Sequence, residues 1–369
     1  MRNPKPFFMV ISICFFALSK CTTSAASGGK PLVTAITKDA NTLLYTAPLK
    51  DGRPLVVDLS GPAITLVCSS KTGTVTRLSA SATDGANPLF PVSFSATASC
   101  ASKAPAGAVG VAGLAPSSQS SLPAQVARTQ KVAKKVALCL PSDGKTTSGN
   151  SVGVAILGGG PLFFIPSDRG DFTTMLAGTA PLRGFNGSPG YFLSATGITV
   201  DRKKVPLSGP LVVGLSSTIP YTALRADVYA AFVKAFDQAA ASPNFSPFVS
   251  RVAAVAPFER CYNSTKLSVG LSRLGYPVPQ IELLLEGGQS FSVLGANSMV
   301  QVKANTACLG FVRMKAAGGG HQAAAAVIGG FQLENHLLVL DEEKKQFGFT
   351  TYLGAIGLSC SSFNFTRAA

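Results

Sequence analysis

The chain is best understood from the stretch Val56-Val57-Asp58-Leu59-Ser60-Gly61-Pro62. Two valines lead into one acidic residue and a Ser-Gly-Pro turn follows, which predicts a buried strand that ends at a turn carrying a carboxylate. Most such aspartates only accept hydrogen bonds from their own turn. The alternative is one half of a catalytic acid pair, and that interpretation requires a second acidic turn later in the chain.

The composition predicts a β-rich protein large enough for two lobes. Of 369 residues, 13% are charged and 46% are hydrophobic, and the chain contains 37 glycines and 24 prolines. Few charges with many glycines and prolines are typical of short strands joined by turns. A chain of this length can bury a sizeable core.

The N-terminus has the pattern of a secretory signal peptide. Arg2 and Lys5 precede an apolar run over 7–18, and Ser24-Ala25-Ala26 supplies small residues for cleavage. A membrane anchor is excluded by length, because a spanning helix needs about 20 apolar residues. We therefore predict a signal peptide over residues 1–26 and a secreted, extracellular protein, without membrane association.

The charge is strongly positive but dispersed. Removing residues 1–26 takes away three basic residues and no acid, so the formal net charge falls from +15 to +12. The basic residues lack aromatic interleaving, which argues against nucleic-acid binding and favours an acidic surface or protein as partner. With two histidines and no CxxC pair, the chain is expected to hold no metal and no cofactor.

Six cysteines remain after the signal peptide: Cys68, Cys100, Cys139, Cys261, Cys308 and Cys360. An even number in an oxidising compartment predicts three disulfides, with fifteen possible pairings.

The order of predicted elements repeats along the chain. A strand, the turn at Asp58, a small-residue segment at Gly113 and a short helix form the first half. A strand over 211–215, the turn at Ser216, a helix and a Gly-Gly turn at 329–330 form the second. This duplication predicts two β lobes, which we place at residues 27–176 and 177–369.

Here the chain resembles plant pepsin-like aspartic proteases, and more narrowly the TAXI-type xylanase inhibitors of cereals. The first resemblance lies in 327–335 with 341–349 and in the cysteine segments Cys261-Tyr262 and 307–311; the second lies in 33–39, 122–127, 255–258 and 297–300. The resemblance implies a mainly β, bilobal pepsin-like aspartic protease fold with few short helices. The segment between Cys68 and Cys100 is shorter than in those inhibitors, so the first lobe is expected to be shortened.

The resemblance places Asp58 at the first catalytic aspartate of the proteases and Ser216 at the second. Proteolysis needs two carboxyls that share a proton around one water, and no aspartate lies between Asp201 and Asp227. Each acid–base role contributes roughly 10²–10⁴ in rate. We therefore expect no enzyme activity, with Asp58 and Ser216 as vestiges of a catalytic pair.

The resemblance further implies an inhibitor of microbial endo-1,4-β-xylanases of glycoside hydrolase family eleven, acting in plant defence as a monomer in the apoplast or cell wall. In the family, a histidine on the loop before the last cysteine reaches the xylanase carboxylates. The corresponding loop here lacks histidine and offers Leu353, Ala355 and Ile356, while Leu274 matches a second contact. Loss of a buried charged partner costs roughly 2–5 kcal/mol of binding free energy. Xylanase inhibition is therefore expected to be weak, retargeted or absent.

Two other functions stay open. One is a basic extracellular globulin that binds a peptide or carbohydrate, and the other is a residual aspartic-type endopeptidase. Leu274 could equally be an ordinary loop leucine packed on its own lobe.

The resemblance also implies two disulfides, Cys261 with Cys308 and Cys139 with Cys360, which leaves Cys68 with Cys100. Asn263-Ser264-Thr265 and Asn364-Phe365-Thr366 are predicted glycosylation sites.

Overall fold

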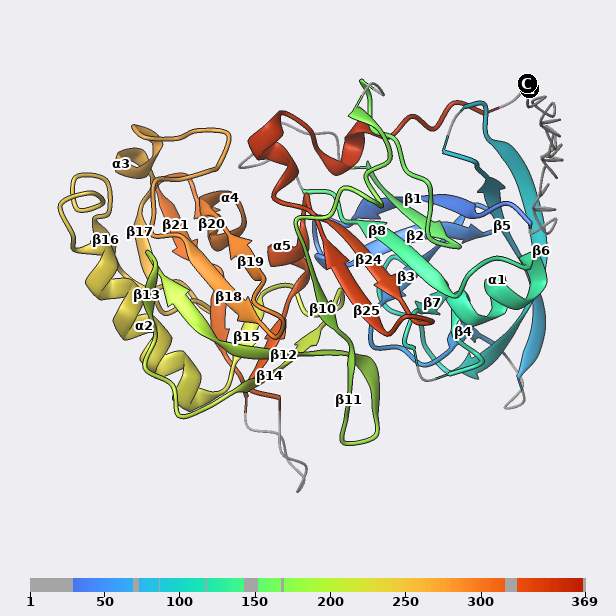
Figure 1. The fold of residues 1–369 in the computed structure, drawn as a ribbon, viewed down its shortest axis with the longest axis horizontal. Helices are drawn as coiled ribbons and strands as arrows, with labels where there is room; N and C mark the ends of the chain where they lie inside the picture. The colour runs from blue at the N-terminus through green and yellow to red at the C-terminus, as the bar shows by residue number, and fades with distance from the viewer. Residues whose placement is uncertain are drawn as a thin grey trace, which may run out of the picture.

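The computed structural model describes residues 29–68, 73–85, 87–116, 118–142, 152–166, 169–315 and 324–367. The predicted signal peptide and His321 lie outside these residues. The described chain forms two β-rich lobes side by side, with the C-terminal strands between them (Figure 1). The expectation of a mainly β, bilobal fold with few short helices is confirmed.

A twelve-stranded sheet makes up the first lobe and the centre of the molecule. In sheet order its strands are β10 (Gly178–Pro181), β25 (Gln346–Phe349), β24 (Leu337–Asp341), β8 (Lys135–Cys139), β9 (Val152–Leu157), β1 (Leu32–Lys38), β2 (Tyr45–Lys50), β3 (Arg53–Asp58), β7 (Gly110–Gly113), β4 (Ile64–Val67), β6 (Phe90–Ala101) and β5 (Thr74–Ala82).

Two further sheets make up the second lobe. The larger contains β19 (Ser290–Val293), β18 (Ile281–Leu285), β12 (Ser188–Val200), β14 (Leu211–Leu215), β23 (Ala326–Ile328), β15 (Thr222–Leu224) and β22 (Phe311–Arg313), with β11 (Arg183–Phe185) and β13 (Lys203–Lys204) paired to β12. The smaller contains β16 (Arg251–Val252), β17 (Cys261–Asn263), β21 (Thr306–Leu309) and β20 (Met299–Lys303).

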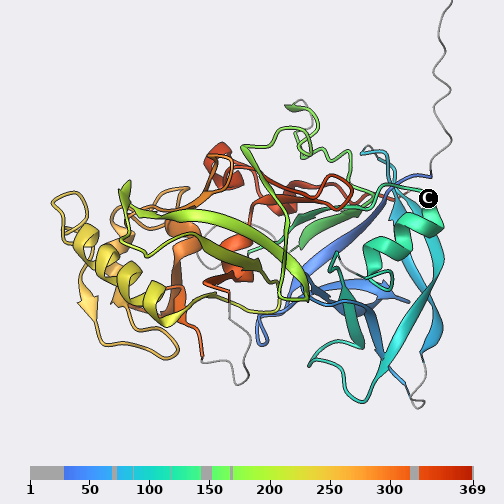
Figure 2. The same ribbon diagram turned by 60° about the horizontal axis from the view of Figure 1, so that its bottom comes forward.

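The helices are short, and the two longest lie on the outside of the sheets at opposite ends of the molecule (Figure 2). They are α1 (Leu122–Gln130), α2 (Ala226–Ala240), α3 (Ser264–Ser268), α4 (Gly295–Ser298) and α5 (Gly330–Leu333), with 3-10 turns η2 (Leu353–Ile356) and η3 (Cys360–Ser362). In α2, Val228, Phe232 and Phe236 recur every fourth residue and are all buried, as the helical period requires. None of the helices among the described residues has the length and apolarity needed to cross a membrane.

Sheet pairing crosses the lobe boundary that we predicted at 176/177. Beyond it, β10 pairs with β25, and β24 pairs with β8 of the first lobe. The two lobes therefore share one continuous sheet and pack on one main core cluster. The boundary itself stays a prediction.

Three disulfides join Cys68 to Cys100, Cys139 to Cys360 and Cys261 to Cys308, and these are the pairings that the resemblance implies. The Cys139–Cys360 bridge spans 221 residues of sequence. It fastens η3, and with it the C-terminal segment that follows, to β8 of the first lobe.

Candidate functional site

The turns after β3 and β14 lie at equivalent places in the two lobes. Strand β3 runs parallel to β7, with Asp58 opposite Gly113. Strand β14 runs parallel to β23, with Leu215 opposite Ile328, and the Ser216 amide donates to the Ile328 carbonyl at 3.0 Å. Asp58 and Ser216 thus leave their strands in the same way.

The hydrogen bonds within the two turns also correspond. Asp58 Oδ1 accepts from the Ser60 amide at 2.9 Å and from its hydroxyl at 2.7 Å. Ser216 Oγ accepts from the Thr218 amide at 3.3 Å and lies 3.3 Å from the Thr218 hydroxyl. In each turn the first side chain binds the residue two positions later.

A glycine lies under each turn because the backbones approach too closely for a side chain. A Cβ atom at Gly113 would lie 2.4 Å from the carbonyl oxygens of Gly61 and Ala63. A Cβ atom at Gly329 would lie 2.4 Å from the carbonyl carbon of Tyr221. The small-residue segment at Gly113 is therefore a place where two backbones come close.

Ser217 joins the two turns across the lobes. Its hydroxyl donates to the Val57 carbonyl at 2.6 Å and accepts from the Leu59 amide at 3.1 Å, and the side chain is fully buried. Position 59 is a leucine, so no side-chain hydroxyl returns an equivalent bond to the second turn. The contact is one-sided, and it brings the Asp58 and Ser216 turns together.

The chemistry available at these turns is limited. Ser216 is 3% exposed and uses its hydroxyl within its own turn. Across the described residues, the hydrogen bonds of the Asp58 carboxylate go to Ser60 and to no second acid. Two carboxyls sharing one proton, the arrangement that peptide hydrolysis of this type requires, are therefore not formed by this pair.

Two other titratable groups are buried away from the turns. Burial raises the pKa of the Glu342 carboxyl, although Lys134 Nζ lies 2.6 Å away. Burial lowers the pKa of His336 to about 4, with the ring between Phe291 and Tyr352 and its Nδ1 3.1 Å from the Thr350 carbonyl. The second histidine of the chain is thus a packed core residue.

The predicted partner contacts come from two loops that meet on one face. Leu274 is 44% exposed on the loop after α3, and Ile356 is 40% exposed at the end of η2. Gly357 lies against Arg273, since a Cβ atom there would be 3.2 Å from Arg273 Nη1. Arg169 Nη1 donates to the Ile356 carbonyl at 3.1 Å. We call Arg169, Arg273, Leu274 and Ile356 the paired-loop surface.

One of the predicted contacts does not hold. Leu353 is fully buried in the core under the C-terminal segment, so its side chain is not accessible to a partner. Ala355 is exposed beside Ile356. Arg169 and Arg273 were missed at the sequence level, because no local signal links positions 169 and 273 to the loop at 356.

The side chains of both predicted glycosylation sites accept hydrogen bonds through oxygen. Asn263 Oδ1 caps α3 by accepting from the amides of Thr265 and Lys266. Asn364 Oδ1 accepts from the Thr366 amide and hydroxyl. Glycosylation at these residues stays a prediction.

Comparison with known proteins gives consistent results. The chain matches the model of the xylanase inhibitor N-terminal domain over residues 45–159 and that of the C-terminal domain over residues 190–351. A protein named chitinase CLP from Oryza sativa subsp. japonica is 46% identical, over 98% of this chain and 99% of the relative.

Solved structures agree with the fold. The structure titled edgp superposes with a TM-score of 0.77 at 26% identity, covering 92% of this chain and 99% of that one. An aspartic proteinase from Irpex lacteus superposes with a TM-score of 0.59 at 13% identity, covering 89% of this chain and 99% of that one. The second similarity concerns the fold alone, and it confirms the pepsin-like architecture expected from the sequence.

Proposed function

Because this chain belongs to the pepsin-like family of TAXi-type xylanase inhibitors, we propose that it is a secreted protein without catalytic activity that binds and inhibits microbial endo-1,4-β-xylanases. Secretion rests on the N-terminal signal pattern over residues 1–26. Plant defence in the apoplast is the biological role that fits such an inhibitor.

The absence of catalysis rests on Ser216 standing where a protease has its second aspartate. The equivalent strand pairing and turn hydrogen bonds of Asp58 and Ser216 support this assignment. A serine hydroxyl does not ionise near neutral pH, so it cannot lower the barrier as the partner of a carboxylate.

The observation that carries the binding role is the paired-loop surface. It presents two exposed apolar side chains, Leu274 and Ile356, next to two arginines, from loops that are far apart in sequence. The cleft of a glycosidase contains catalytic carboxylates, and a cationic rim would be attracted to them. Arginine forms the stronger, two-pronged hydrogen bonds with carboxylates, so it can replace the charge of a missing histidine.

A panel titration tests this proposal. The mature protein is added to family-eleven xylanases and hydrolysis of xylan is followed, together with the variants Ile356→Asp and Val75→Asp. Val75 is 73% exposed in the first lobe and serves as the matched control. We expect inhibition by the unmodified protein and by Val75→Asp, and at least a tenfold weaker inhibition by Ile356→Asp. Failure of the unmodified protein to inhibit any xylanase would refute the proposal.

The name of the rice relative suggests a second candidate, activity on chitin. Glycoside hydrolysis generally uses two carboxyl groups flanking the bond, and the Asp58 turn contributes one. Chitin oligosaccharides incubated with the protein should therefore remain intact. Their cleavage, lost on Asp58→Asn, would establish this candidate in place of the inhibitor.

A further inference from the structure

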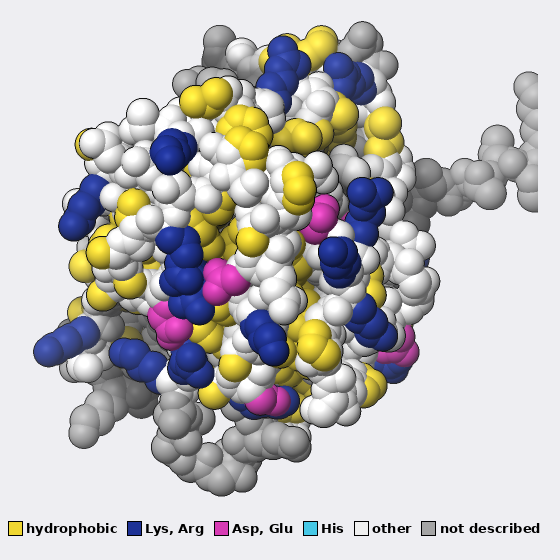
Figure 3. Space-filling model, turned by 90° about the vertical axis from the view of Figure 1, so that its left-hand side faces the viewer, with side chains coloured by type: hydrophobic (Ala, Val, Ile, Leu, Met, Phe, Trp, Pro, Cys, Tyr) yellow, Lys and Arg dark blue, Asp and Glu magenta, His cyan; other side chains and the backbone are white. Residues whose placement is uncertain are grey.

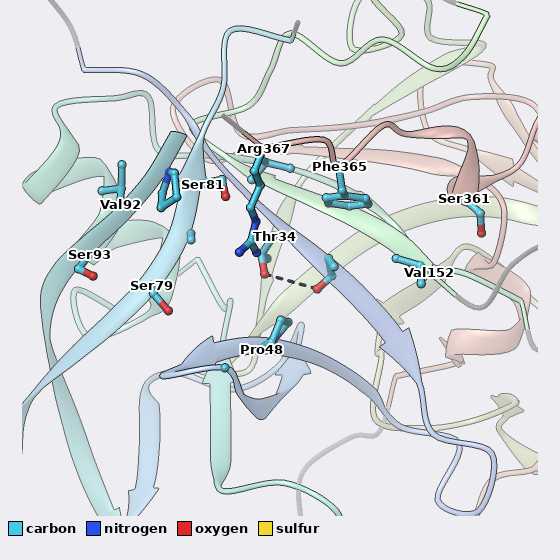
Figure 4. A pocket seen from close by; sticks show the side chains of 15 residues that line it. Thr34, Pro48, Ser79, Ser81, Val92, Ser93, Val152, Ser361, Phe365 and Arg367 are labelled. Carbon is cyan, nitrogen blue, oxygen red and sulfur yellow. Dashed lines mark hydrogen bonds between the residues drawn. The ribbon is translucent and has the colours of Figure 1, made fainter. Parts of the chain in front are cut away.

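A cavity of about 620 Å³ lies in the first lobe, away from the Asp58 turn and from the paired-loop surface. It is bounded by strands β1, β2, β5, β6 and β9 and by the segment after η3 (Figure 4). Ligand sites in proteins commonly enclose roughly 300–1,000 Å³. We call this space the tail pocket, after the C-terminal segment that forms one wall.

One wall of the tail pocket is lined with hydroxyl groups. Ser79 and Ser81 lie on the same face of β5, because side chains alternate along a strand, and Ser93 of β6 pairs directly with Ser79. Thr34 of β1 adds a fourth hydroxyl. Within the described part of the chain, the hydroxyls of Ser79, Ser81 and Ser93 have no hydrogen-bond partner, so a ligand could bind all three.

The opposite wall carries an aromatic ring and a cation. Phe365 and Arg367 are two residues apart, and both side chains enter the pocket in Figure 4. The segment is held in place by a hydrogen bond from the Leu89 amide to the Thr366 carbonyl at 3.0 Å and by the edge-on contact of Phe363 with Phe365. The disulfide Cys139–Cys360 anchors its start. The wall formed by Phe365 and Arg367 is therefore a fixed part of the fold.

The electrostatics of the tail pocket favour an anion. Of its described lining residues, Arg367 is the one that carries a charge, and none is acidic. No carboxylate within the described part of the chain pairs with Arg367. The guanidinium is therefore free to bind a ligand carboxylate through two parallel hydrogen bonds.

We propose that the tail pocket binds an acidic sugar, that is, a uronic-acid unit of an oligosaccharide. The carboxylate pairs with Arg367, the face of the pyranose ring packs on Phe365, and the sugar hydroxyls bond with Ser79, Ser81 and Ser93. Each part of this ligand corresponds to a group on a different wall. A simple phosphate or sulfate ion would use Arg367 and leave the ring and the serine row without a role.

This inference is independent of the proposed xylanase inhibition, because it involves the opposite end of the C-terminal segment from Ile356 and a different lobe from Leu274. A protein could bind an acidic sugar here whether or not it inhibits a glycosidase. The two experiments can therefore succeed or fail separately.

Isothermal titration calorimetry, which measures the affinity of the mature protein for trigalacturonate, tests the inference. Its fully methyl-esterified form is the matched ligand control, because it keeps the sugar rings and removes the charge. The variant Arg367→Gln removes the pocket cation, and Lys203→Gln on the exposed strand β13 removes one charge elsewhere. Phe365→Ala removes the stacking ring. Far-ultraviolet circular dichroism checks that each variant is folded.

We expect trigalacturonate to bind, with the methyl ester and the Arg367→Gln variant each at least about tenfold weaker, as the loss of a charge-assisted pair predicts. Lys203→Gln should bind as the unmodified protein does, and Phe365→Ala should bind several-fold more weakly. Four results would overturn the inference. They are no binding of trigalacturonate at millimolar concentration, equal binding of acid and ester, equal losses in Arg367→Gln and Lys203→Gln, and binding of inorganic phosphate as tight as that of trigalacturonate. Equal losses in the two variants would indicate attraction by net charge alone.

Discussion

At the scale of single residues, position 217 matters as much as position 216. Ser216 keeps the turn hydrogen bonds of Asp58 but supplies no carboxyl. Ser217 holds the two turns together through the Val57 carbonyl and the Leu59 amide. The pair of turns is therefore preserved as a structural joint between the lobes, although the acid pair is not formed there.

Replacing Ser217 should measurably weaken this joint. In Ser217→Ala, a buried carbonyl and a buried amide each lose a partner, which costs about 1–3 kcal/mol in the free energy of unfolding. Urea unfolding followed by tyrosine fluorescence measures the loss. Ser95→Ala on the exposed face of β6 is the control and should be unchanged. Equal stability of both variants would show that the bridge contributes nothing.

His336 gives a second prediction, for the pH dependence of stability. Burial lowers its pKa from 6.5 to about 4 in the folded protein. Between these values the unfolded chain binds the proton and the folded protein does not, so acid favours unfolding. Above pH 6.5 the imidazole is neutral in both states and lowers the free energy of unfolding by nothing. As the pH falls from 6.5 to 4, protonation of the unfolded chain lowers the free energy of unfolding by about 3 kcal/mol.

Urea unfolding at a series of pH values between 7 and 4 tests this prediction. We expect the free energy of unfolding to fall with pH, and to fall less steeply in His336→Phe, whose ring still packs on Phe291 and Tyr352. If both proteins show the same slope, His336 is not the group responsible.

At the scale of elements, a buried ion pair connects β1 and β2 to the segment between α5 and β24. Lys38 Nζ lies 2.7 Å from Glu334 Oε1, and the Tyr45 hydroxyl donates to the same oxygen at 2.6 Å. The side chains of Lys38 and Glu334 are 6% and 3% exposed. Breaking a buried pair from one side leaves an unpaired buried charge, whereas replacing both partners can cost little.

A double-mutant cycle tests the role of this pair. Lys38→Met and Glu334→Leu alone should each lower the free energy of unfolding by about 3–5 kcal/mol, and the double variant should lose less than the sum. Chemical denaturation of all four proteins supplies the values. Additive losses would mean that the two side chains are not coupled.

The sequence predicted elements well where a local pattern specifies them. The four-residue spacing of Val228, Phe232 and Phe236 indicates α2, and Pro123 lies in the first turn of α1, where proline is favoured. Which strands share a sheet was harder to predict from the sequence. The pairing of β24 with β8 joins residues about 200 positions apart, and no local sequence pattern indicates it. Leu353 was misjudged for the same reason, since its burial depends on packing against distant strands.

The candidate surfaces show the same limit. Asp58, Ser216 and the cysteine pairs could be named from the resemblance, and the turn geometry supports the first two. The paired-loop surface and the tail pocket depend on residues that the fold brings together from far apart, such as Arg273 with Gly357 and Ser79 with Arg367. No periodicity or motif in the chain indicates such contacts.

At the scale of the whole molecule, the protein is a basic scaffold on which the two proposed binding surfaces lie at separate places. Lysine and arginine side chains are spread over the end of the second lobe rather than gathered in one patch, with few acids among them (Figure 3). The formal net charge of the full sequence, +15, is likewise positive. Such a surface favours approach to acidic partners, and the attraction weakens as salt is added.

The most direct measurement of the central claim is the inhibition constant of one family-eleven xylanase with the unmodified protein, Asp58→Asn and Leu274→Asp. If the scaffold binds through the paired loops and the old catalytic turn is only structural, Asp58→Asn should inhibit as the unmodified protein does. Leu274→Asp should inhibit at least tenfold more weakly. The opposite pattern, loss of inhibition on Asp58→Asn with no effect of Leu274→Asp, would contradict the account.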